Sequence, residues 1–167
     1  MALNEALLAE FDHEMGNTRR VLERVPDDKF DWQPHAKSMT VRQLALHLAL
    51  FPSWTTEIFD RASLDIAPPG QPAYQPPVVK SRQELLEIFD RDIVKARQGI
   101  EAASDRQLLE NWTLLAGGKT IFSMPRIAAV RSMVMNHMIH HRAQFGVYLR
   151  LNDLPVPGLY GPSADES

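Results

Sequence analysis

Residues 124–152 read MPRIAAVRSMVMNHMIHHRAQFGVYLRLN, and this long amphipathic stretch decides the fold. Residues three or four apart in a helix lie on one face, one turn above another. We therefore predict one long helix over about 124–152, with Ser123 as its N-cap and Pro125 in its first turn, where a missing N–H does no harm. Its core-facing stripe consists of Ile127, Val130, Val134, His137, His141, Phe145 and Tyr148.

Two histidines, His137 and His141, stand in this otherwise apolar stripe. Burying an imidazole without a partner is costly, so both rings need hydrogen-bond acceptors or a metal ion. A third histidine, His47, interrupts a second apolar stripe formed by Leu44, His47, Phe51, Trp54 and Ile58. Three imidazoles from two core-facing stripes indicate a metal site.

The rest of the chain contains three further amphipathic segments, predicted as helices over about 4–24, 40–61 and 81–103. Thr40 with Gln43 and Ser81 with Glu84 have the spacing of capping boxes. Pro52 lies inside the second predicted helix and is expected to kink it. Four long amphipathic helices without a convincing large sheet predict an all-α protein, a four-helix bundle forming a single domain over 1–167.

The segments between these helices are predicted to be mostly irregular. Leu64–Lys80 is rich in proline and is expected to be a long crossover loop. Within 108–123, β-prone runs flank Gly117-Gly118 and predict a small β-hairpin before the last helix, although a plain loop gives a similar pattern. The tail, about 153–167, is rich in proline, glycine and acidic residues and is expected to be irregular.

The composition excludes several classes of function. The chain has no cysteine, so disulfides, zinc ribbons and a thiol nucleophile supplied by the protein are excluded. The net charge is −3 and basic residues are scattered, which gives no support for nucleic-acid binding. No apolar run approaches the ~20 residues that span a bilayer, and the first residues lack the pattern of a signal peptide. A cytoplasmic protein without a membrane partner is the resulting expectation.

The metal-site hypothesis competes with a simpler one, in which the imidazoles only form hydrogen bonds within the core. Asp12, Glu14 and Asp92 are possible acceptors in that case. His-x-x-x-His on one helix with a third histidine from another supplies three ligands with open positions. Such a set accepts zinc, nickel, copper or iron. The remaining histidines rank lower: His140 as a flanking or second-shell group, His13 as an exposed helix residue or a fourth ligand, and His35 as a solvent-facing residue.

Three segments of the sequence resemble the DinB-like family of bacterial damage-inducible proteins. They are Trp32-Gln33-Pro34 leading into 40–48 (TVRQLALHL), 136–144 (NHMIHHRAQ) and 157–166 (PGLYGPSADE). The resemblance covers nearly the whole chain, with Ala143 as one departure, where many relatives carry glycine. It implies a four-helix bundle, a divalent metal held by three histidines that map onto His47, His137 and His141, and frequent homodimers. Relatives with assigned activities include thiol-dependent transferases and a thiol-dependent isomerase.

These observations lead to a first hypothesis, a metal-dependent enzyme that activates an exogenous low-molecular-weight thiol or water, similar to a thiol transferase. With no cysteine in the chain, any thiol must come from outside. Hydrolysis by an activated water is the variant of this hypothesis. The alternative is a non-catalytic, metal-binding, dimeric stress-response or scaffold module, in which metal binding stabilises the fold. His13, Asn17 and Gln144 are candidates only for orienting a substrate, and no catalytic base is evident.

Overall fold

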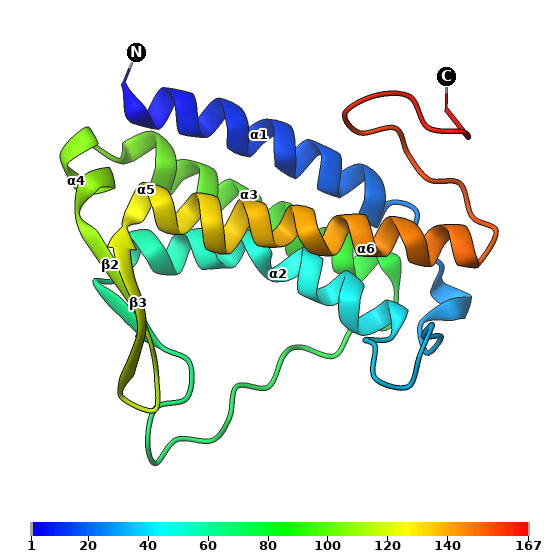
Figure 1. Cartoon of the computed structure of the whole chain (residues 1–167), viewed down its shortest axis with the longest axis horizontal. Helices are drawn as coiled ribbons and strands as arrows, with labels where there is room; N and C mark the ends of the chain where they lie inside the picture. The colour runs from blue at the N-terminus through cyan, green and yellow to red at the C-terminus, as the bar shows by residue number, and fades with distance from the viewer. Residues whose placement is uncertain (1, 167) are drawn as a thin grey trace.

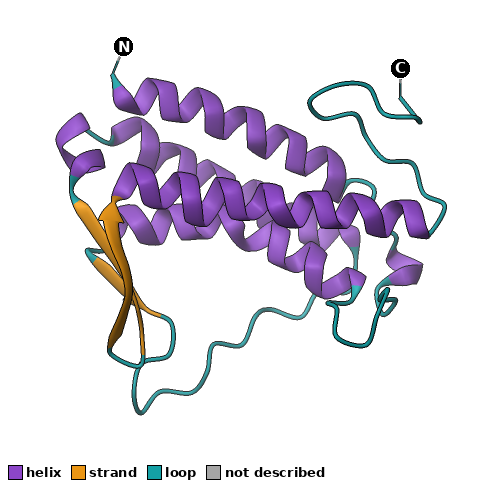
Figure 2. Cartoon of the chain, in the orientation of Figure 1, coloured by secondary structure: helices purple, strands orange, loops and turns teal. Residues whose placement is uncertain are grey.

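A computed structural model of the chain describes residues 2–166. The protein is mostly helical, with a small three-stranded sheet at one end (Figures 1 and 2). Four long helical segments lie side by side along the long axis of the molecule and bury a common apolar core, which includes Phe11, Leu48, Phe89 and Phe145. The first three are α1 (Leu3–Leu22), α2 (Val41–Asp60) and α3 (Arg82–Ala102).

The fourth segment differs from the continuous α-helix predicted for 124–152. It consists of α5 (Arg126–Ala129), the π-helix η2 (Val130–Asn136) and α6 (His137–Leu151). The predicted cap at Ser123 is wrong, because Ser123 and Pro125 belong to β3 (Lys119–Pro125) and pair with the preceding strand. Strand pairing therefore delays the start of the helix to Arg126, whose N–H donates to the carbonyl of Glu110 (3.0 Å).

The small sheet confirms the predicted hairpin and adds a strand that the sequence did not predict. β2 (Asn111–Ala116) pairs antiparallel with β3, and Gly117 and Gly118 adopt φ values of +61° and +76° in the turn, which glycine tolerates without strain. β1 (Ser63–Asp65) pairs parallel with β2, so the crossover predicted to be irregular from Leu64 begins as a strand. The short helices η1 (Asp27–Lys29) and α4 (Asp105–Leu109) were also not predicted.

Two predicted helix starts are confirmed by their hydrogen bonds. The Thr40 hydroxyl accepts from the Gln43 N–H (3.2 Å), and the Thr40 N–H donates to the Gln43 side chain (2.9 Å), which completes a capping box. The Ser81 hydroxyl accepts from the Glu84 N–H (3.2 Å). α2 continues as a helix through Pro52 to Asp60.

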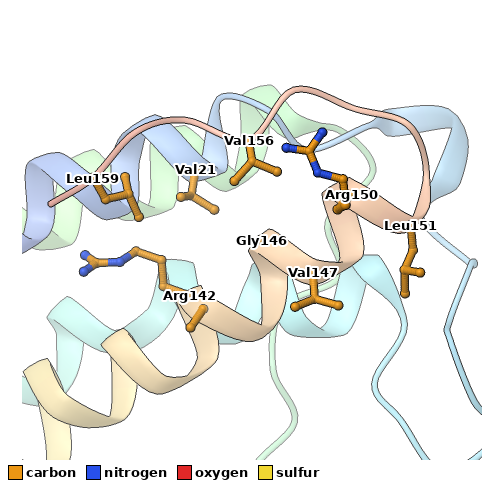
Figure 3. Close-up of a pocket in the computed structure, with 9 residues that line it drawn as sticks. Val21, Arg142, Gly146, Val147, Arg150, Leu151, Val156 and Leu159 are labelled. Carbon is orange, nitrogen blue, oxygen red and sulfur yellow. The ribbon is translucent and has the colours of Figure 1, made fainter. Parts of the chain in front are cut away.

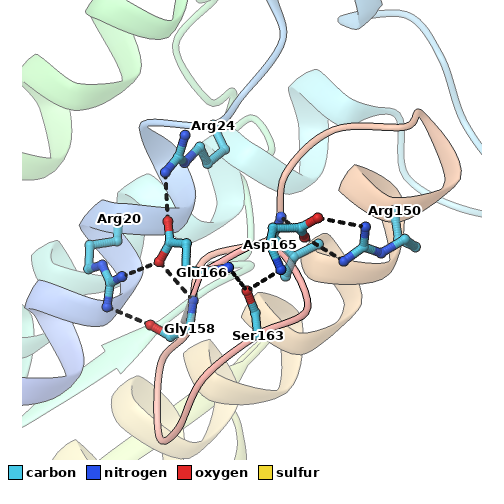
Figure 4. Close-up of polar contacts among 8 residues, drawn as sticks. Arg20, Arg24, Arg150, Gly158, Ser163, Asp165 and Glu166 are labelled. Carbon is cyan, nitrogen blue, oxygen red and sulfur yellow. Dashed lines mark hydrogen bonds and ion pairs between the residues drawn. The ribbon is translucent and has the colours of Figure 1, made fainter.

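Residues 153–166 contain no helix or strand, as predicted, but the tail is attached to the helices by ion pairs (Figure 4). Glu166 accepts from Arg20 of α1 (2.6 Å) and from Arg24 in the turn that follows α1 (2.7 Å), and Asp165 pairs with Arg150 of α6 (2.5 Å). The tail therefore joins the first and last helices of the molecule.

Within residues 2–166, none of the helices has the length and apolar character needed to cross a membrane.

Candidate metal centre

The structure brings together the three histidines that the sequence singles out, His47 from α2 and His137 and His141 from α6. Each offers one ring nitrogen, and these three nitrogens all lie within 4.8 Å of one another. The imidazole centroids are 4.7–5.3 Å apart. We refer to these three residues as the triad. All three side chains are half-buried, so the triad lies at the edge of the core and is open to a ligand on one side.

Gln144, one turn beyond His141 on α6, determines which nitrogen of His141 carries a proton. The Oε1 atom of Gln144 lies 2.7 Å from Nδ1 of His141. A carbonyl oxygen can only accept a hydrogen bond, so Nδ1 must donate and Nε2 is left with a bare lone pair. The Nε2 atom of Gln144 lies 3.1 Å from the ring of His140, which orients the amide. Gln144 therefore directs the Nε2 lone pair of His141 into the triad.

His137 lies directly after the π-helix η2. Its backbone N–H donates to the carbonyl of Val134, where a regular α-helix would pair it with the carbonyl of Met133. The Met133 carbonyl acts near the His137 ring and opposes the lowering of its pKa by burial. The change from π-helix to α-helix therefore falls at a ring that the sequence marks as a ligand.

The Nε2 atoms of His137 and His141 are 3.0 Å apart, which is hydrogen-bond distance. Because Nδ1–H of His141 donates to Gln144, the Nε2 lone pair of His141 is available to accept a hydrogen bond from Nε2–H of His137 or to bind a cation. Burial, followed by the charges of the other two imidazoles, lowers the pKa of His47 to about 4. Burial also lowers the pKa of His137. Both shifts favour the neutral imidazole of His47 and His137, the form that metal ions bind.

Phe51, one turn after His47 on α2, forms the apolar wall behind the triad. Its ring centroid lies 4.7 Å from that of His47 and 4.8 Å from that of His137, and its side chain is only 2% exposed. An apolar wall limits the access of water and lowers the local dielectric, which strengthens electrostatic interactions at the open side of the triad.

A pocket of about 440 Å³ opens beside the triad, and we call it the triad pocket. His141 and Gln144 form part of its wall, so a molecule bound there would lie next to the triad. The remaining lining residues come from the connector before α2, from α2 and from the outer part of α6: Lys37, Ser38, Met39, Leu44, Val147 and Tyr148.

The acceptors considered for a purely structural role of the histidines are engaged elsewhere. Asp12 pairs with Arg97 (3.0 Å), Glu14 with Arg142 (2.6 Å) and Asp92 with Arg91 (2.8 Å). The structure therefore does not support the hypothesis that these carboxylates satisfy the triad.

The other three histidines lie outside the cluster of ligand nitrogens. His13 is exposed and lies 3.2 Å from the Asn17 amide, so the structure does not place it as a fourth ligand. His35 is exposed, as expected, and its ring accepts from the Lys37 N–H (3.1 Å). His140 acts through Gln144, which agrees with the second-shell position expected for it.

Comparison with known proteins places this fold and these motifs in one family. The model of the DinB family matches residues 1–167. The chain belongs to the DinB family. The structure is similar to that of a DinB-like protein from Bacillus cereus, with a TM-score of 0.70 and 19% identity, covering 93% of this chain and 97% of the other. It is also similar to a DinB-like protein from Bacillus subtilis, with a TM-score of 0.66 and 18% identity, covering 90% and 95%. Comparison with curated proteins gives no match.

This DinB family protein has a second polar cluster directly beside the triad, which the sequence did not predict. Arg142 follows His141 on α6 and is 2% exposed. Its guanidinium donates to the Glu14 carboxylate (2.6 Å), the Glu14 carbonyl (2.9 Å), the Thr18 hydroxyl (3.0 Å) and the Tyr160 hydroxyl. The Tyr160 hydroxyl in turn donates to Glu14 (2.7 Å). We call Glu14, Thr18, Arg142 and Tyr160 the Arg142 network. It joins α1, α6 and the tail.

A separate pocket of about 390 Å³ lies between α6 and the tail (Figure 3). Val156 and Leu159 of the tail and Val21 of α1 line it opposite Gly146 and Val147 of α6. Its two arginines, Arg142 and Arg150, are already paired with Glu14 and Asp165. This pocket has no free metal-ligating group in its lining and belongs to the attachment of the tail.

Proposed function

We propose that this protein is a metal-dependent enzyme that activates an exogenous thiol or water at His47, His137 and His141, in the manner of a thiol transferase. The observation that carries the proposal is the convergence of three ring nitrogens within 4.8 Å of one another, with Gln144 directing the Nε2 lone pair of His141 toward the other two rings. A divalent cation would replace the proton between the Nε2 atoms of His137 and His141, which lie 3.0 Å apart. Neutral imidazoles with oriented Nδ1–H groups are the usual ligand form in protein metal sites.

The protein groups at this site would have three different roles: metal binding, orientation of the ligands and formation of the pocket walls. The three imidazoles would hold a divalent transition metal (zinc, nickel, copper or iron), and Gln144 keeps His141 in the binding tautomer. A bound divalent ion supplies Lewis acidity and lowers the pKa of a thiol or a water molecule that reaches it. Phe51 keeps the inner side apolar, while the triad pocket admits the organic part of the substrate.

The thiol in this proposal is external, because the chain contains no cysteine. We expect a low-molecular-weight thiol to enter through the triad pocket, which is the larger of the two pockets described above. We interpret the four long helical segments as a single-domain four-helix bundle. We also propose that the protein forms a homodimer, as the family resemblance implies.

The first experiment measures metal content by elemental mass spectrometry on untagged wild-type protein and on the His47→Ala and His137→Ala variants. We expect near-stoichiometric metal in the wild type and its loss in both variants. His35→Ala, in an exposed histidine outside the triad, is the matched control and should retain metal. A wild-type protein that neither contains metal nor takes up zinc, nickel or iron on titration would refute the site.

The second experiment tests catalysis with pairs of a thiol and an electrophile. Turnover that needs both the metal and the thiol supports transfer, whereas turnover without thiol supports hydrolysis. Equal activity of the wild type and His137→Ala on every pair would refute a catalytic role of the triad.

One observation favours the non-catalytic alternative, a metal-binding scaffold module. The described lining of the triad pocket contains no carboxylate, so apart from the ligands themselves only Lys37 and Tyr148 could transfer a proton there. If the alternative holds, the protein binds metal and gains stability from it but shows no turnover. Cells carrying a protein with all three histidines replaced would then lose function only to the extent that the protein unfolds.

A further inference from the structure

The triad pocket has an asymmetric distribution of charge that bears on which ligands it admits. Met39, Leu44 and Val147 give it apolar walls, and Ser38, Gln144 and Tyr148 contribute neutral polar groups. Apart from the imidazole of His141, Lys37 is the one ionisable basic group of its described lining, which contains no acidic residue. Among the ion pairs found in residues 2–166, none includes Lys37. The pocket therefore presents a single ammonium group without a carboxylate to neutralise it.

The segment that carries Lys37 is held in place by hydrogen bonds. The Ser38 N–H donates to the His35 carbonyl (2.9 Å), and the Lys37 N–H donates to the His35 ring (3.1 Å). The Tyr148 hydroxyl of α6 donates to the Met39 carbonyl (3.0 Å), which ties the end of this turn to the helix that carries His141. The backbone of Lys37 is thus positioned in advance beside the triad, which reduces the entropy cost of using its side chain for binding.

We propose that the triad pocket selects ligands that carry an anionic group, such as a carboxylate, on a short apolar stem, and that Lys37 determines this selectivity. This inference rests on the proposed function and names the chemistry of the thiol that the site takes. The sulfur would reach the triad while the stem contacts Met39 and Val147 and the anion pairs with the Lys37 ammonium. An ammonium group acts as a point charge on a flexible stem, so it tolerates small differences in stem length.

The test uses full-length protein loaded with Co²⁺ and three small thiols that differ in charge: 3-mercaptopropionate, 2-mercaptoethanol and cysteamine. Thiol binding is followed by the thiolate-to-cobalt charge-transfer absorption. Each thiol is compared between the wild type and Lys37→Gln, so differences in thiol pKa and the attraction of the metal charge cancel. We expect Lys37→Gln to lower the affinity for 3-mercaptopropionate about three- to tenfold, as for loss of a partly exposed ion pair, and to leave the affinity for 2-mercaptoethanol unchanged.

Two further variants complete the design. Lys37→Glu should lower the affinity for 3-mercaptopropionate further and raise the affinity for cysteamine. Lys119→Gln, in the hairpin at the other end of the molecule (Figure 1), is the matched control and should not change the affinity for any of the three thiols. Thiols that bind with the same affinity in the wild type and Lys37→Gln would overturn the charge selectivity and leave the proposed function standing. Failure to take up Co²⁺, or an absent thiolate band with all three thiols, would overturn the proposed function and this inference with it.

Discussion

Two adjacent residues of α6, His141 and Arg142, face two polar clusters that are built in opposite ways. Arg142 is buried, and its guanidinium meets a carboxylate, a carbonyl and two hydroxyls. His141 is half-buried, and its Nε2 atom lies 3.0 Å from Nε2 of His137, beside the ring of His47. The first cluster is satisfied by the protein alone, whereas the second brings together three imidazoles that could hold a metal ion.

The comparison shows how a fold can hold a cluster of imidazoles in place. Arg142 ties α6 to α1 and to the tail through the Arg142 network, and this fixes the rotation of the helix that carries His137 and His141. The cost of partly burying three imidazoles together is thus offset by strong hydrogen bonds one residue away. Buried ion pairs with complete hydrogen bonding are suited to such a role in specifying position.

The largest expected effect is on stability, from Arg142→Met. Removing the guanidinium leaves the Glu14 carboxylate buried without its partner, and we expect the free energy of unfolding to fall by about 3–5 kcal/mol. Urea denaturation of metal-free protein measures this change. The double variant Arg142→Met with Glu14→Met removes both charges and should recover much of the loss. A fall in the free energy of unfolding of less than about 1 kcal/mol for Arg142→Met would contradict this comparison, because the Arg142 network would then not anchor α6.

His141→Ala is the matched control for this prediction, since the two residues are neighbours on one helix. In metal-free protein it removes a half-buried ring that contacts only the His137 ring and the exposed Gln144 side chain through hydrogen bonds, so we expect the free energy of unfolding to change by less than about 1 kcal/mol. The same variant should lose metal. A large loss of stability in Arg142→Met, together with a loss of metal but little loss of stability in His141→Ala, would establish that adjacent residues of α6 serve stability and metal binding separately.

The next effect concerns Gln144, which orients His141 without belonging to the triad. Gln144→Ala should lower metal affinity by about 10- to 100-fold, as is typical for loss of an outer-shell partner. Competition with a chromophoric chelator measures this affinity. Gln144→Glu keeps an acceptor for the Nδ1–H of His141 and should bind metal with an affinity close to that of the wild type. An unchanged affinity in Gln144→Ala would show that the tautomer of His141 is set by something else.

A smaller effect is expected from pH in the metal-free protein. The pKa of His47 is lowered to about 4, so between pH 6.5 and 4 the unfolded chain binds a proton that the folded chain does not. Stability therefore falls as the pH drops through this range and is fully present above pH 6.5. After discounting for partial exposure, we expect a loss of about 1–2 kcal/mol. His47→Gln should show a shallower pH dependence; an identical slope would contradict a depressed pKa.

The smallest effect concerns the exposed ion pairs of the tail. Glu166→Gln weakens contacts with Arg20 and Arg24 that are open to solvent. We expect the free energy of unfolding to fall by about 0–1 kcal/mol at low salt and to be unchanged at high salt. Thermal unfolding at low and high ionic strength measures it. A loss as large as that of Arg142→Met would mean that the tail is held by its exposed charges and not by Tyr160.

Much of the triad could be predicted because its signal is local. His137 and His141 stand four residues apart in an apolar stripe, and His47 breaks a second one. Gln144 could have been assigned its role from its spacing of three residues after His141, which suits a contact along a helix. The π-helix before His137 could not be predicted, because it leaves little trace in the apolar periodicity.

The parts that the sequence did not predict depend on partners far along the chain. β1 is three residues long and becomes a strand only because β2, almost fifty residues later, pairs with it. The Arg142 network unites α1, α6 and the tail, and nothing near Arg142 in the sequence identifies Glu14 or Tyr160 as its partners. The start of the last helix was misplaced because Ser123 and Pro125 suit a helix start and a strand end equally well, and strand pairing decided between them.

The π-helix at 130–136 lies between two anchored parts of one helical segment. Arg126, before it, is fixed to the end of α2 through the carbonyls of Ile58 and of Arg61, the residue after that helix, and Arg142, after the π-helix, is fixed to α1. Each residue of an α-helix advances the rotation by about 100°. Deleting one residue from η2 to restore a regular helix would therefore turn one anchor away from its partners. The wide turn of η2 corrects this difference in rotation, so the part of the segment next to the sheet and the part that carries His137 and His141 each keep the orientation that their own contacts require.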